Sequence, residues 1–371
     1  MADERPALKV GDERVVEIGP VAHGGHFIAH ADCRTLFVRH ALPGETVRVT
    51  ITEVSRRLVR ADAIEVISAS PERVAAPCSW AGPGRCGGCD FQHVSLVAQR
   101  DLKTQVLRES LVRFGGLAAD DPLLTTSVEA LPGRPDGLRW RTRVTWALAP
   151  DGTRGLRPHR SHEVLPVDDC LIAEEAVSRP ETVLPAHVHR EVRDRTWRLG
   201  RGDFWQVHPD LPEALVSAVL EYGAPSAGER WIDLYAGAGL FSAFLAEAVG
   251  PSGSVDAVEM SEEALRVARR ALHDLPQARL HRADVTAWLR QSQDRPDGVV
   301  LDPPPAGAGR EIVTAVACHG PRTVVYVACD PVALARDVSY FAAAGYRLEA
   351  LRSFDAFPMT HHFESVALLR K

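Results

Sequence analysis

One cysteine, Cys329, stands where a buried strand would end and a helix would begin. The apolar run 323–328 precedes it, and Asp330-Pro331 follows it. In open parallel sheets, ligands and reacting groups gather at the carboxyl ends of the strands. A thiol in that place is a candidate nucleophile, because thiolates readily form covalent intermediates. The alternative is a small apolar side chain that only fills space, as many free cysteines do.

Two carboxyl groups also stand at predicted strand ends. Asp302 lies in "VVLDPPPAG", where the prolines stiffen the chain and direct the carboxylate into a cleft. Glu364 opens the apolar run "ESVALL" two residues after His362, which predicts both side chains on one face at the start of a strand. A polar pair is unusual for packing there and natural for a site. A carboxylate within hydrogen-bonding reach of a reacting group can act as a general base.

The run "DLYAGAGLFS" predicts a glycine-rich turn between a strand and a helix. Asp233 closes the strand, and Gly237 and Gly239 form a turn of the kind that binds nucleotides in doubly wound sheets. Glu259 and Asp284 follow at the ends of the next two predicted strands. Acidic residues at three successive strand ends are more typical of an S-adenosylmethionine site than of an NAD site. The alternative is that each acidic residue caps the helix that follows it.

Four further cysteines predict a metal centre. They lie in a Gly- and Pro-rich segment, "PCSWAGPGRCGGCDFQH", and in one later loop: Cys78, Cys86, Cys89 and Cys170. Gly87-Gly88 allows Cys86 and Cys89 to face one centre. Such a set can hold zinc or an iron–sulfur cluster, and three clustered cysteines with one distant partner favour the cluster. Cys33 and Cys318 lack such neighbours, and we expect them to be apolar packing residues.

The composition is that of a globular protein with two or three domains. The chain has 371 residues, of which 45% are hydrophobic and 25% charged, and its net charge is −6. It contains no apolar run of membrane-spanning length, and its polar start, "MADERPALK", is not typical of a signal peptide. We therefore expect a monomeric cytoplasmic protein whose thiols are reduced, metal-bound or catalytic rather than paired in disulfides.

The sequence divides into three predicted domains. Residues 1–70 contain short strand-like runs separated by Gly- and Pro-containing turns, which predicts a small OB-like β-barrel. Residues 71–195 form a Cys-rich central domain with one clear helix, 95–114, capped by Ser95 and placed to pack on the catalytic domain. In residues 196–371, strands and helices alternate, which predicts a Rossmann-like α/β domain with a mostly parallel sheet.

Arginine residues concentrate in one part of the central domain. Seven arginines and two tryptophans, Trp140 and Trp146, lie in the segment 134–160, with two acidic residues among them. In an acidic chain this concentration favours a surface that contacts nucleic-acid phosphates, where aromatic side chains stack on unpaired bases. The alternative is a solvated charged surface without a partner.

Taken in order along nearly the whole chain, these motifs resemble those of the RNA uracil-C5-methyltransferases that act on tRNA or ribosomal RNA. The first segment, "GPVAHGGHFIAH" with "LFVRHALPGETVRV", is similar to the TRAM barrel of that family. The resemblance continues through "CGGCDFQH", "WRTRV", "FWQVHP", "DLYAGAGLFS", "LDPPPAG", "YVACDP" and "FPMTHHFESVALL". Each motif alone is unspecific, but their combination in this order is highly specific.

The resemblance implies a class I methyltransferase that uses S-adenosylmethionine and carries a 4Fe–4S cluster on the four cysteines named above. It implies that Cys329 is the nucleophile and Glu364 the base. It implies cofactor contacts from Gln206, Tyr235, Leu240, Glu259, Asp284 and Asp302. In this chemistry a thiolate adds to carbon 6 of uracil, carbon 5 then takes the methyl group, and a base removes the carbon-5 proton. The uridine must be single-stranded or flipped out of a helix.

Three positions depart from the pattern of that family. His208 stands where an asparagine is common, Pro305 where an arginine is common, and "ACDP" replaces Ser-Cys-Asn-Pro, so that Asp330 takes the place of the asparagine. These departures leave the implied nucleophile, base and cofactor residues in place. The barrel together with the cluster favours ribosomal RNA over tRNA as the substrate. The sequence does not indicate which group would activate the thiol.

Two other functions share part of these features. One is an S-adenosylmethionine-dependent methyltransferase of a small molecule or a protein, which needs neither a barrel, a cysteine cluster nor Cys329. The other is a non-catalytic RNA-binding protein, against which the intact Cys329 and Glu364 argue. A denaturation-resistant adduct with RNA that contains 5-fluorouridine would distinguish the covalent mechanism from both.

Overall fold

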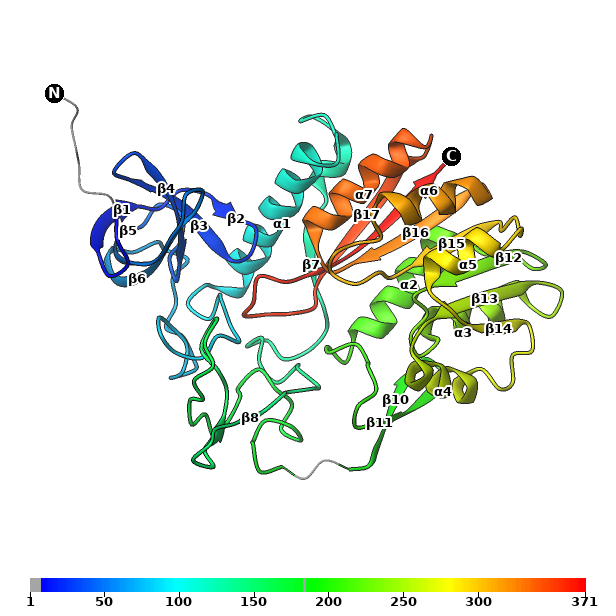
Figure 1. Cartoon of the computed structure of the whole chain (residues 1–371), viewed down its shortest axis with the longest axis horizontal. Coiled ribbons are helices and arrows are strands. Elements are labelled where there is room, and N and C mark those ends of the chain that lie inside the picture. Colours follow the sequence, from blue (N-terminus) through cyan, green and yellow to red (C-terminus); the bar gives the residue numbers. More distant parts are fainter. Residues whose placement is uncertain (1–7, 183–184) are drawn as a thin grey trace. The chain divides into compact units, whose positions relative to one another are not determined.

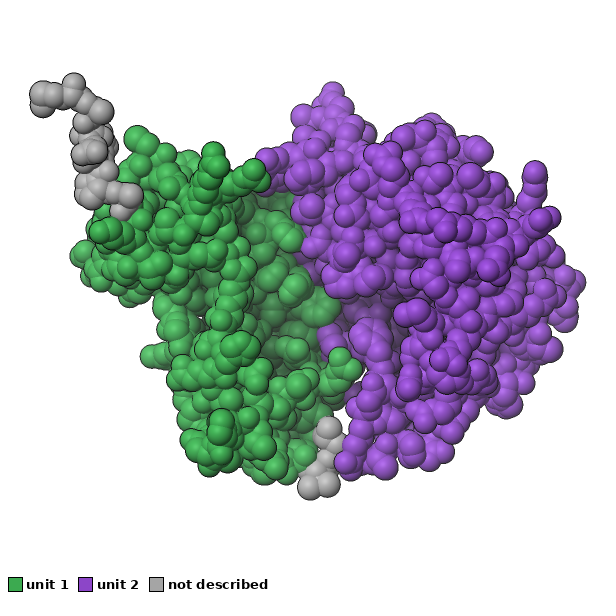
Figure 2. All heavy atoms as spheres, viewed as in Figure 1, with its two compact units in different colours: residues 1–106, 134–182, 357–362 green, residues 107–133, 183–356, 363–371 purple. Residues whose placement is uncertain are grey.

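The computed structural model describes residues 8–182 and 185–371, which form two compact units. Figure 1 shows the elements along the chain, and Figure 2 colours the two units. The first unit comprises residues up to 106, 134–182 and 357–362; the second comprises 107–133, 183–356 and 363–371. Each unit has its own apolar core. Among the described residues, no helix is both long and apolar enough to cross a membrane.

The first unit is built on a six-stranded sheet in the order β1-β5-β6-β4-β3-β2. Its strands are β1 (Glu13–Glu17), β2 (Val21–Ala22), β3 (His26–Ala31), β4 (Arg34–Arg39), β5 (Thr46–Val54) and β6 (Val59–Ser68). Neighbouring strands are antiparallel except β4 and β6, which are parallel. Along β5, Val47, Val49 and Ile51 are buried and the residues between them are partly exposed, as in a strand with one face on a core. The predicted N-terminal β-domain is confirmed.

Helix α1 (Leu96–Arg113) follows the cysteine-rich loop of the first unit. Ser95 caps it, because its Oγ accepts a hydrogen bond from the N–H of Ala98 at 3.3 Å. Beyond its end, Gly116 adopts a φ of 75°, which stops the helix. The predicted helix and its predicted cap are therefore confirmed. Leu107 and Leu111, in the second half of α1, belong to the core of the second unit. The short strands β8 (Ala147–Leu148) and β9 (Arg154–Gly155) pair later in the first unit.

The second unit contains an eight-stranded sheet, a separate hairpin and helices α2 to α7. The sheet strands are β7 (Val128–Ala130), β12 (Arg230–Leu234), β13 (Ser254–Glu259), β14 (Ala278–Arg282), β15 (Gly298–Leu301), β16 (Thr323–Ala328), β17 (Arg347–Asp355) and β18 (Glu364–Arg370). The helices are α2 (Leu211–Gly223), α3 (Leu240–Val249), α4 (Glu262–Ala271), α5 (Val285–Gln291), α6 (Gly309–His319) and α7 (Pro331–Ala343). The hairpin pairs β10 (His187–Val192) with β11 (Arg195–Gly200), and a 3-10 helix spans Pro122–Thr125.

The strand order of the large sheet is β14-β13-β12-β15-β16-β18-β17-β7. Strands β12 to β16 run parallel, and β18 runs antiparallel to both β16 and β17. Helices α2, α3 and α4 cover one face, and α5, α6 and α7 cover the other (Figure 1). This is the predicted Rossmann-like α/β architecture. The strand order reverses between β12 and β15, and at such a reversal the carboxyl ends of the strands open a crevice for ligands.

The central strands are apolar throughout because helices cover both faces of the sheet. Every residue of β15 and β16 is buried, which is typical of central parallel strands. Several of the helices that follow begin at a polar cap, whose side chain accepts a hydrogen bond from the first helical turn: Ser261 for α4, Asp284 for α5 and Asp330 for α7. These caps hold polar groups beside the strand ends.

Some local predictions were wrong. Strand β18 begins at Glu364, so His362 precedes the strand instead of sharing its first face. Cys33 and Cys318 are exposed rather than packed in a core, because Cys33 lies in the turn between β3 and β4 and Cys318 lies near the end of α6. The sequence also did not predict the hairpin β10–β11, because the residues of its first strand are mostly polar and exposed.

The loop 357–362, between β17 and β18, belongs to the first unit. The N–H groups of Asp90 and Phe91 both donate to the carbonyl of Met359 at 2.9 Å. The buried side chain of Gln99 accepts from the N–H of Met359 at 2.7 Å and donates to the carbonyl of Phe91 at 3.1 Å. These bonds fix the middle of the loop, because each polar group in this buried setting has a partner.

A buried carboxylate fixes the end of the same loop. Oδ2 of Asp90 lies 2.6 Å from Nδ1 of His361, and Oδ1 lies 3.0 Å from Nη2 of Arg39 in β4. Burial disfavours the ionised form of Asp90, but the hydrogen bond from His361 and the charges of His361 and Arg39 outweigh it, so the pKa lies below the usual 3.8. The ionised Asp90 therefore ties the loop to the β-domain.

We predict that Asp90→Asn lowers the free energy of unfolding near pH 7 by about 3 kcal/mol, because Arg39 stays buried without its counter-charge. Because the folded-state pKa of Asp90 is depressed, its contribution is present above the ordinary carboxyl pKa and is lost as the pH falls below it. The difference between wild type and variant should shrink from about pH 5 to about pH 2. Denaturant unfolding across that range measures it, and a constant difference would contradict the prediction.

Candidate active site and cysteine centre

Cys329 and Glu364 lie near each other at the carboxyl ends of the parallel strands of the large sheet. Strands β16 and β18 pair antiparallel, and the last pair of their ladder is Ala328 with Ser365. Cys329 directly follows β16, and Glu364, the first residue of β18, directly precedes Ser365. The charge of Glu364 acts on the Cys329 thiol, so the two groups are electrostatic neighbours. The structure thus brings together the predicted nucleophile and the predicted base.

Asp302 lies at the end of the neighbouring strand. It directly follows β15, and its N–H donates to the carbonyl of Leu234 in β12 at 3.3 Å. Asp233, one residue before Leu234, is buried and accepts a hydrogen bond from Oγ of Ser242 at 2.5 Å. Burial, and then the charge of Asp233, raises the pKa of Asp302 to about 7. Burial also raises the pKa of Asp233 to about 7. Both carboxyl groups therefore hold their protons more strongly than an exposed aspartate does.

The surroundings of Cys329 disfavour its thiolate. Burial raises the pKa of the thiol to about 12, and the charges of Glu364, Asp302 and Asp330 act in the same direction. Burial, and then Asp302, raises the pKa of Glu364 well above its usual range. Both the thiol and Glu364 therefore favour their neutral forms. The carboxyl groups around the thiol oppose its activation.

The turn between β12 and α3 has the backbone of a nucleotide-binding loop. Gly237 and Gly239 have φ angles of 55° and 78°, and Tyr235 has a φ of 63°, which is rare for a residue with a side chain. Glu259, at the end of β13, accepts hydrogen bonds from the N–H of Gly237 at 3.0 Å and from the N–H of Ser261 at 2.6 Å. Backbone strain of this kind is concentrated at ligand sites.

The other predicted cofactor residues lie on separate elements of the second unit. Leu240 is buried at the first position of α3. Asp284 caps α5 by accepting from the N–H of Ala287 at 3.0 Å, so the capping alternative holds for it. Burial, and then the charge of Asp284, raises the pKa of Tyr235 to about 12, which makes these two side chains electrostatic neighbours. Gln206 lies half-buried in the segment between β11 and α2.

Asp337 is a site residue that sequence reasoning missed. This buried carboxylate of α7 accepts from Oη of Tyr326 at 2.7 Å and from the N–H groups of Ala308 and Gly309 at 2.7 and 3.1 Å. It therefore holds the chain that follows Asp302 against β16 and acts as a positioning residue. An acidic residue within a helix usually faces solvent, so no local pattern indicates this role.

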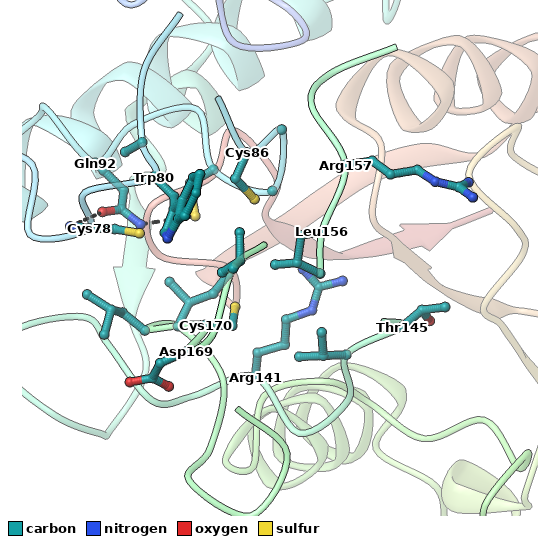
Figure 3. A pocket seen from close by; sticks show the side chains of 18 residues that line it. Cys78, Trp80, Cys86, Gln92, Arg141, Thr145, Leu156, Arg157, Asp169 and Cys170 are labelled. Atoms are coloured by element: carbon teal, nitrogen blue, oxygen red, sulfur yellow. Dashed lines mark hydrogen bonds between the residues drawn. The ribbon is translucent and has the colours of Figure 1, made fainter. Parts of the chain in front are cut away.

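The four cysteines of the predicted metal centre line one cavity of about 280 Å³ in the first unit (Figure 3). Three come from the loop before α1 and one from a later loop: Cys78, Cys86, Cys89 and Cys170. In Figure 3 the ring of Trp80 lies between Cys78 and Cys86. None of these four is in a disulfide. The structure therefore collects the four predicted ligands around one space.

The cavity cysteines offer thiol donors, and the thiolate forms of three of them are disfavoured in the structure. Burial raises the pKa of the thiols of Cys86, Cys89 and Cys170, and the charges of neighbouring cysteines add to that effect. Within residues 8–182 and 185–371, no group of three or more His, Cys, Asp or Glu side chains is arranged to hold a metal ion, so the metal centre stays a prediction. Four thiolates are the donor set of a 4Fe–4S cluster, which occupies more space than a zinc ion.

The arginine-rich segment 134–160 is in part an internal ion-pair network. Arg139 forms a bidentate pair with Asp169 at 2.7 and 2.8 Å, and Arg160 pairs with Glu53 at 2.9 Å. Two other arginines line the cysteine cavity: Arg141 and Arg157. The prediction of a phosphate-contacting surface therefore applies to fewer arginines than the sequence indicates.

The three departures from the family pattern have different settings. His208 is buried, its Nδ1 lies 3.2 Å from the N–H of Asp210, and burial lowers its pKa. Pro305 is exposed in the loop after β15. Asp330 caps α7, which an asparagine would do equally well. Unlike an asparagine, Asp330 carries a charge that helps to raise the pKa of Cys329.

Two family models match the chain. Residues 7–64 match the TRAM domain, and residues 187–371 match the tRNA (uracil-5-)-methyltransferase model. The first match falls on the six-stranded sheet of the first unit, and the second includes the whole of the α/β sheet except β7.

Similar proteins span nearly the whole chain. An RNA methyltransferase of Streptomyces coelicolor is 42% identical over 98% of this chain and 94% of its own length. A 23S rRNA (uracil(1939)-C(5))-methyltransferase of Chromohalobacter salexigens is 30% identical over 96% of this chain and 89% of its own. A similar solved structure is that of the Pyrococcus abyssi tRNA (uracil-54, C5)-methyltransferase in complex with S-adenosyl-L-homocysteine. The match covers 95% of this chain and 99% of that chain, with a TM-score of 0.70 and 20% sequence identity. This match shows a similar fold.

We predict that Asp302→Asn lowers the pKa of the Cys329 thiol, because it removes a negative charge that opposes the thiolate. Each unit by which the pKa falls gives about tenfold more thiolate at a fixed pH below it. The pH dependence of alkylation of Cys329 by iodoacetamide, followed by mass spectrometry of its peptide, measures the change. Asp284→Asn is the control, because Asp284 is not among the charges that mainly raise the pKa of Cys329. An unchanged or higher pKa in Asp302→Asn would show that this carboxylate does not act on the thiol.

Proposed function

This chain belongs to the RNA (uracil-5-)-methyltransferase family, and we propose that it methylates carbon 5 of a specific uridine in ribosomal RNA. In this proposal the thiolate of Cys329 forms a transient covalent bond to carbon 6 of uracil. The observation that carries it is the register of β16 and β18, whose last pair, Ala328 with Ser365, directly adjoins Cys329 and Glu364. A nucleophile and a base held on one rigid sheet suit a reaction that needs both on the same ring.

S-adenosylmethionine is the proposed methyl donor. The candidate contacts lie around the turn after β12, near the ends of β13, β14 and β15, and before α2: Gln206, Tyr235, Leu240, Glu259, Asp284 and Asp302. When bound, this cofactor supplies an electrophilic methyl group on a sulfonium. The P. abyssi enzyme, which has the same fold, contains S-adenosyl-L-homocysteine, and this supports the assignment.

Cys329 provides the electrons that carbon 5 lacks. When its thiolate adds to carbon 6, the sulfur–carbon bond forms and the pair of the 5,6 double bond moves into the ring as an enolate. Carbon 5 can then attack an electrophilic methyl group, which an unmodified uracil does too slowly. Carbon 5 afterwards carries both the methyl group and its original hydrogen, so a base must remove that proton before the sulfur can leave.

Glu364 is the proposed base. Removal of the carbon-5 proton returns its electron pair to the 5,6 double bond, and the bond from carbon 6 to the sulfur of Cys329 breaks. Burial raises the pKa of Glu364, so its carboxylate, once ionised, binds a proton more strongly than an exposed carboxylate does. The environment that makes Glu364 hard to ionise also makes its carboxylate, once formed, a stronger base for this proton.

Ribosomal RNA is the favoured substrate over tRNA. The relative that is named as a 23S rRNA uracil methyltransferase is 30% identical to this chain, whereas the tRNA-modifying P. abyssi enzyme is 20% identical. The TRAM match and the four-cysteine cavity agree with the sequence-based choice. The N-terminal β-domain and the basic groups of the first unit would hold the RNA, with the target uridine unpaired.

The four-cysteine cavity is proposed to hold a 4Fe–4S cluster. Its support is the donor set, four free thiols around one space of about 280 Å³. The proposed methyl transfer consumes no electron, so the cluster has a structural role here. It would cross-link the loop that carries Cys78, Cys86 and Cys89 to the loop that carries Cys170, in a part of the chain with little regular secondary structure.

We predict that Glu364→Gln traps a covalent complex with RNA, because the thiolate can add and the methyl group can transfer but the carbon-5 proton stays in place. Turnover should fall by about 100-fold or more. Incubation with a labelled 23S rRNA fragment and S-adenosylmethionine, followed by a denaturing gel, detects the complex.

Cys329→Ala is the matched control for that experiment. It should give neither complex nor methylated RNA while it still binds S-adenosylmethionine. Normal turnover of Glu364→Gln without a trapped complex would assign proton removal to another group. Activity of Cys329→Ala within about tenfold of wild type would exclude the covalent mechanism.

We predict that anaerobically purified protein is brown and contains about four irons per chain. Cys86→Ser should lose iron, lower the melting temperature and weaken RNA binding more than it weakens cofactor binding. Cys33→Ser, at the exposed cysteine of the same unit, should change none of these. Iron analysis, thermal melting and RNA titration give the three readouts. Colourless anaerobic protein with one zinc per chain would exclude the iron–sulfur assignment.

A further inference from the structure

A second cavity of about 280 Å³ lies beside the cysteine cavity in the first unit. Residues of β4, β5 and β6 line one part of it, and the loop that leads to Cys86 and residues 158–160 line the other. Four guanidinium groups belong to its lining: Arg39, Arg60, Arg85 and Arg160. The lining contains two carboxyl groups, Glu53 and Asp62. Neither the proposed methyl transfer nor the cluster uses these groups.

One carboxylate is shared between two of the arginines. Oε2 of Glu53 lies 2.5 Å from Nη1 of Arg60 and 2.9 Å from Nη1 of Arg160. A carboxylate carries one negative charge, so this three-membered group has a net positive charge. Its position at the end of β5 places that charge at the wall of the cavity.

The other charged groups of the lining do not cancel this excess. Arg85 donates to the carbonyl of Ser79, an acceptor without a formal charge. Arg39 is paired with Asp90 at 3.0 Å. Burial raises the pKa of Asp62, although the charge of Arg39 opposes this, so Asp62 is a weaker counter-charge than an exposed aspartate. The cavity therefore has more positive than negative charge, in a chain whose net charge is −6.

Two histidines of the lining respond to the same field. Burial, and then the charge of Arg39, lowers the pKa of His40 to about 3. Burial, Arg39 and Arg160 lower the pKa of His159. Both rings therefore favour the neutral form, which can donate a hydrogen bond without adding charge. The cavity thus offers fixed guanidinium charges together with neutral donors.

We propose that this cavity binds a phosphate group of the RNA backbone. Guanidinium groups match phosphate oxygens in bidentate geometry, and neutral imidazoles add hydrogen bonds. The inference deepens the proposed function and rests on RNA as the substrate, since the RNA backbone is the polyanion that this enzyme must hold. A phosphate in the cavity would take over part of the role of Glu53 and leave each arginine with a charged partner.

The cavity also gives the cysteine centre a physical link to RNA. Cys86 forms an isolated β-bridge with Pro158, and the N–H of Gly87 donates to the carbonyl of Arg157 at 2.9 Å. The loop that carries Arg85 and the loop that carries Arg160 are therefore joined by backbone hydrogen bonds. Anything that orders the cysteine loop also orders these two guanidinium groups.

The test is the salt dependence of RNA binding by Arg85→Gln, Arg160→Gln and the double variant, in a Cys329→Ala background so that no adduct forms. Each lost phosphate contact should reduce the slope of log K against log salt by about 0.7 and weaken binding of a labelled 23S rRNA fragment at low salt. Arg48→Gln is the matched control, because Arg48 lies on β5 but pairs with Glu65 away from the cavity. It should leave the slope unchanged.

Glu53→Gln separates a binding role from a structural one. Removal of its charge frees Arg60 and Arg160 for phosphate, so RNA affinity should rise by about threefold to tenfold even if the melting temperature falls. Loss of affinity in Glu53→Gln together with a normal salt slope in the double variant would overturn the proposal. A second outcome would also overturn it. Inorganic phosphate would stabilise the wild type but not the double variant, while the double variant bound RNA normally. The cavity would then hold free phosphate and not a phosphate of RNA.

Two further measurements show why binding is lost if it is lost. They are the iron content of the cavity variants and RNA binding by Cys329→Ala protein with an intact cavity. The Arg85 and Arg160 variants should keep the iron content of the wild type, and a loss of iron that fully accounts for the weaker binding would overturn the proposal. If the Cys329→Ala protein with an intact cavity binds no RNA, the proposed function fails together with the phosphate site. If it binds RNA and the Arg85 and Arg160 variants bind RNA with the same affinity and the same salt slope, the phosphate site alone fails.

Discussion

The antiparallel insertion of β18 between β16 and β17 is the constraint on which the active site depends. Parallel strands bring only their carboxyl ends to the ligand edge of a sheet, but an antiparallel strand brings its amino end there. Glu364 reaches the edge for this reason, one position beyond the pair Ala328–Ser365. A parallel strand in the same place would present Arg370 instead. The strand direction therefore selects which end of the C-terminal segment can meet Cys329.

The carboxyl groups at this end of the sheet act in opposite directions on the proposed base, Glu364, and on the proposed nucleophile, Cys329. Asp233, Asp302 and Glu364 are all buried deeply enough to raise their pKa values. A carboxylate formed there binds a proton strongly, but its charge also opposes the thiolate of Cys329. The thiolate forms most easily while the neighbouring carboxyl groups hold their protons.

Local patterns predicted the elements, and long-range contacts determined the environment of the site. Apolar runs and the Ser95 cap are signals within a few residues, so the α/β domain and helix α1 could be predicted from sequence. Asp337 acts on a loop about 30 residues earlier in the chain, and Asp90 acts on His361, far later. No spacing rule encodes such pairs, because they form only when the fold brings separate segments together. The sequence therefore identified candidate site residues but not the neighbouring groups that position them or shift their pKa values.

The positions of the arginines follow the same principle. A guanidinium group that is paired with its own carboxylate, such as Arg139 with Asp169, contributes little positive electrostatic potential to its surroundings. Arg160 is different because its partner, Glu53, is also paired with Arg60. Glu53 lies in β5, Arg60 lies in β6, and Arg160 lies in a loop about 100 residues later. Positive potential therefore depends on how carboxylates are distributed among arginines rather than on arginine density in a segment. In an acidic chain, a fold that makes two arginines share one carboxylate creates a basic site without any excess of basic residues.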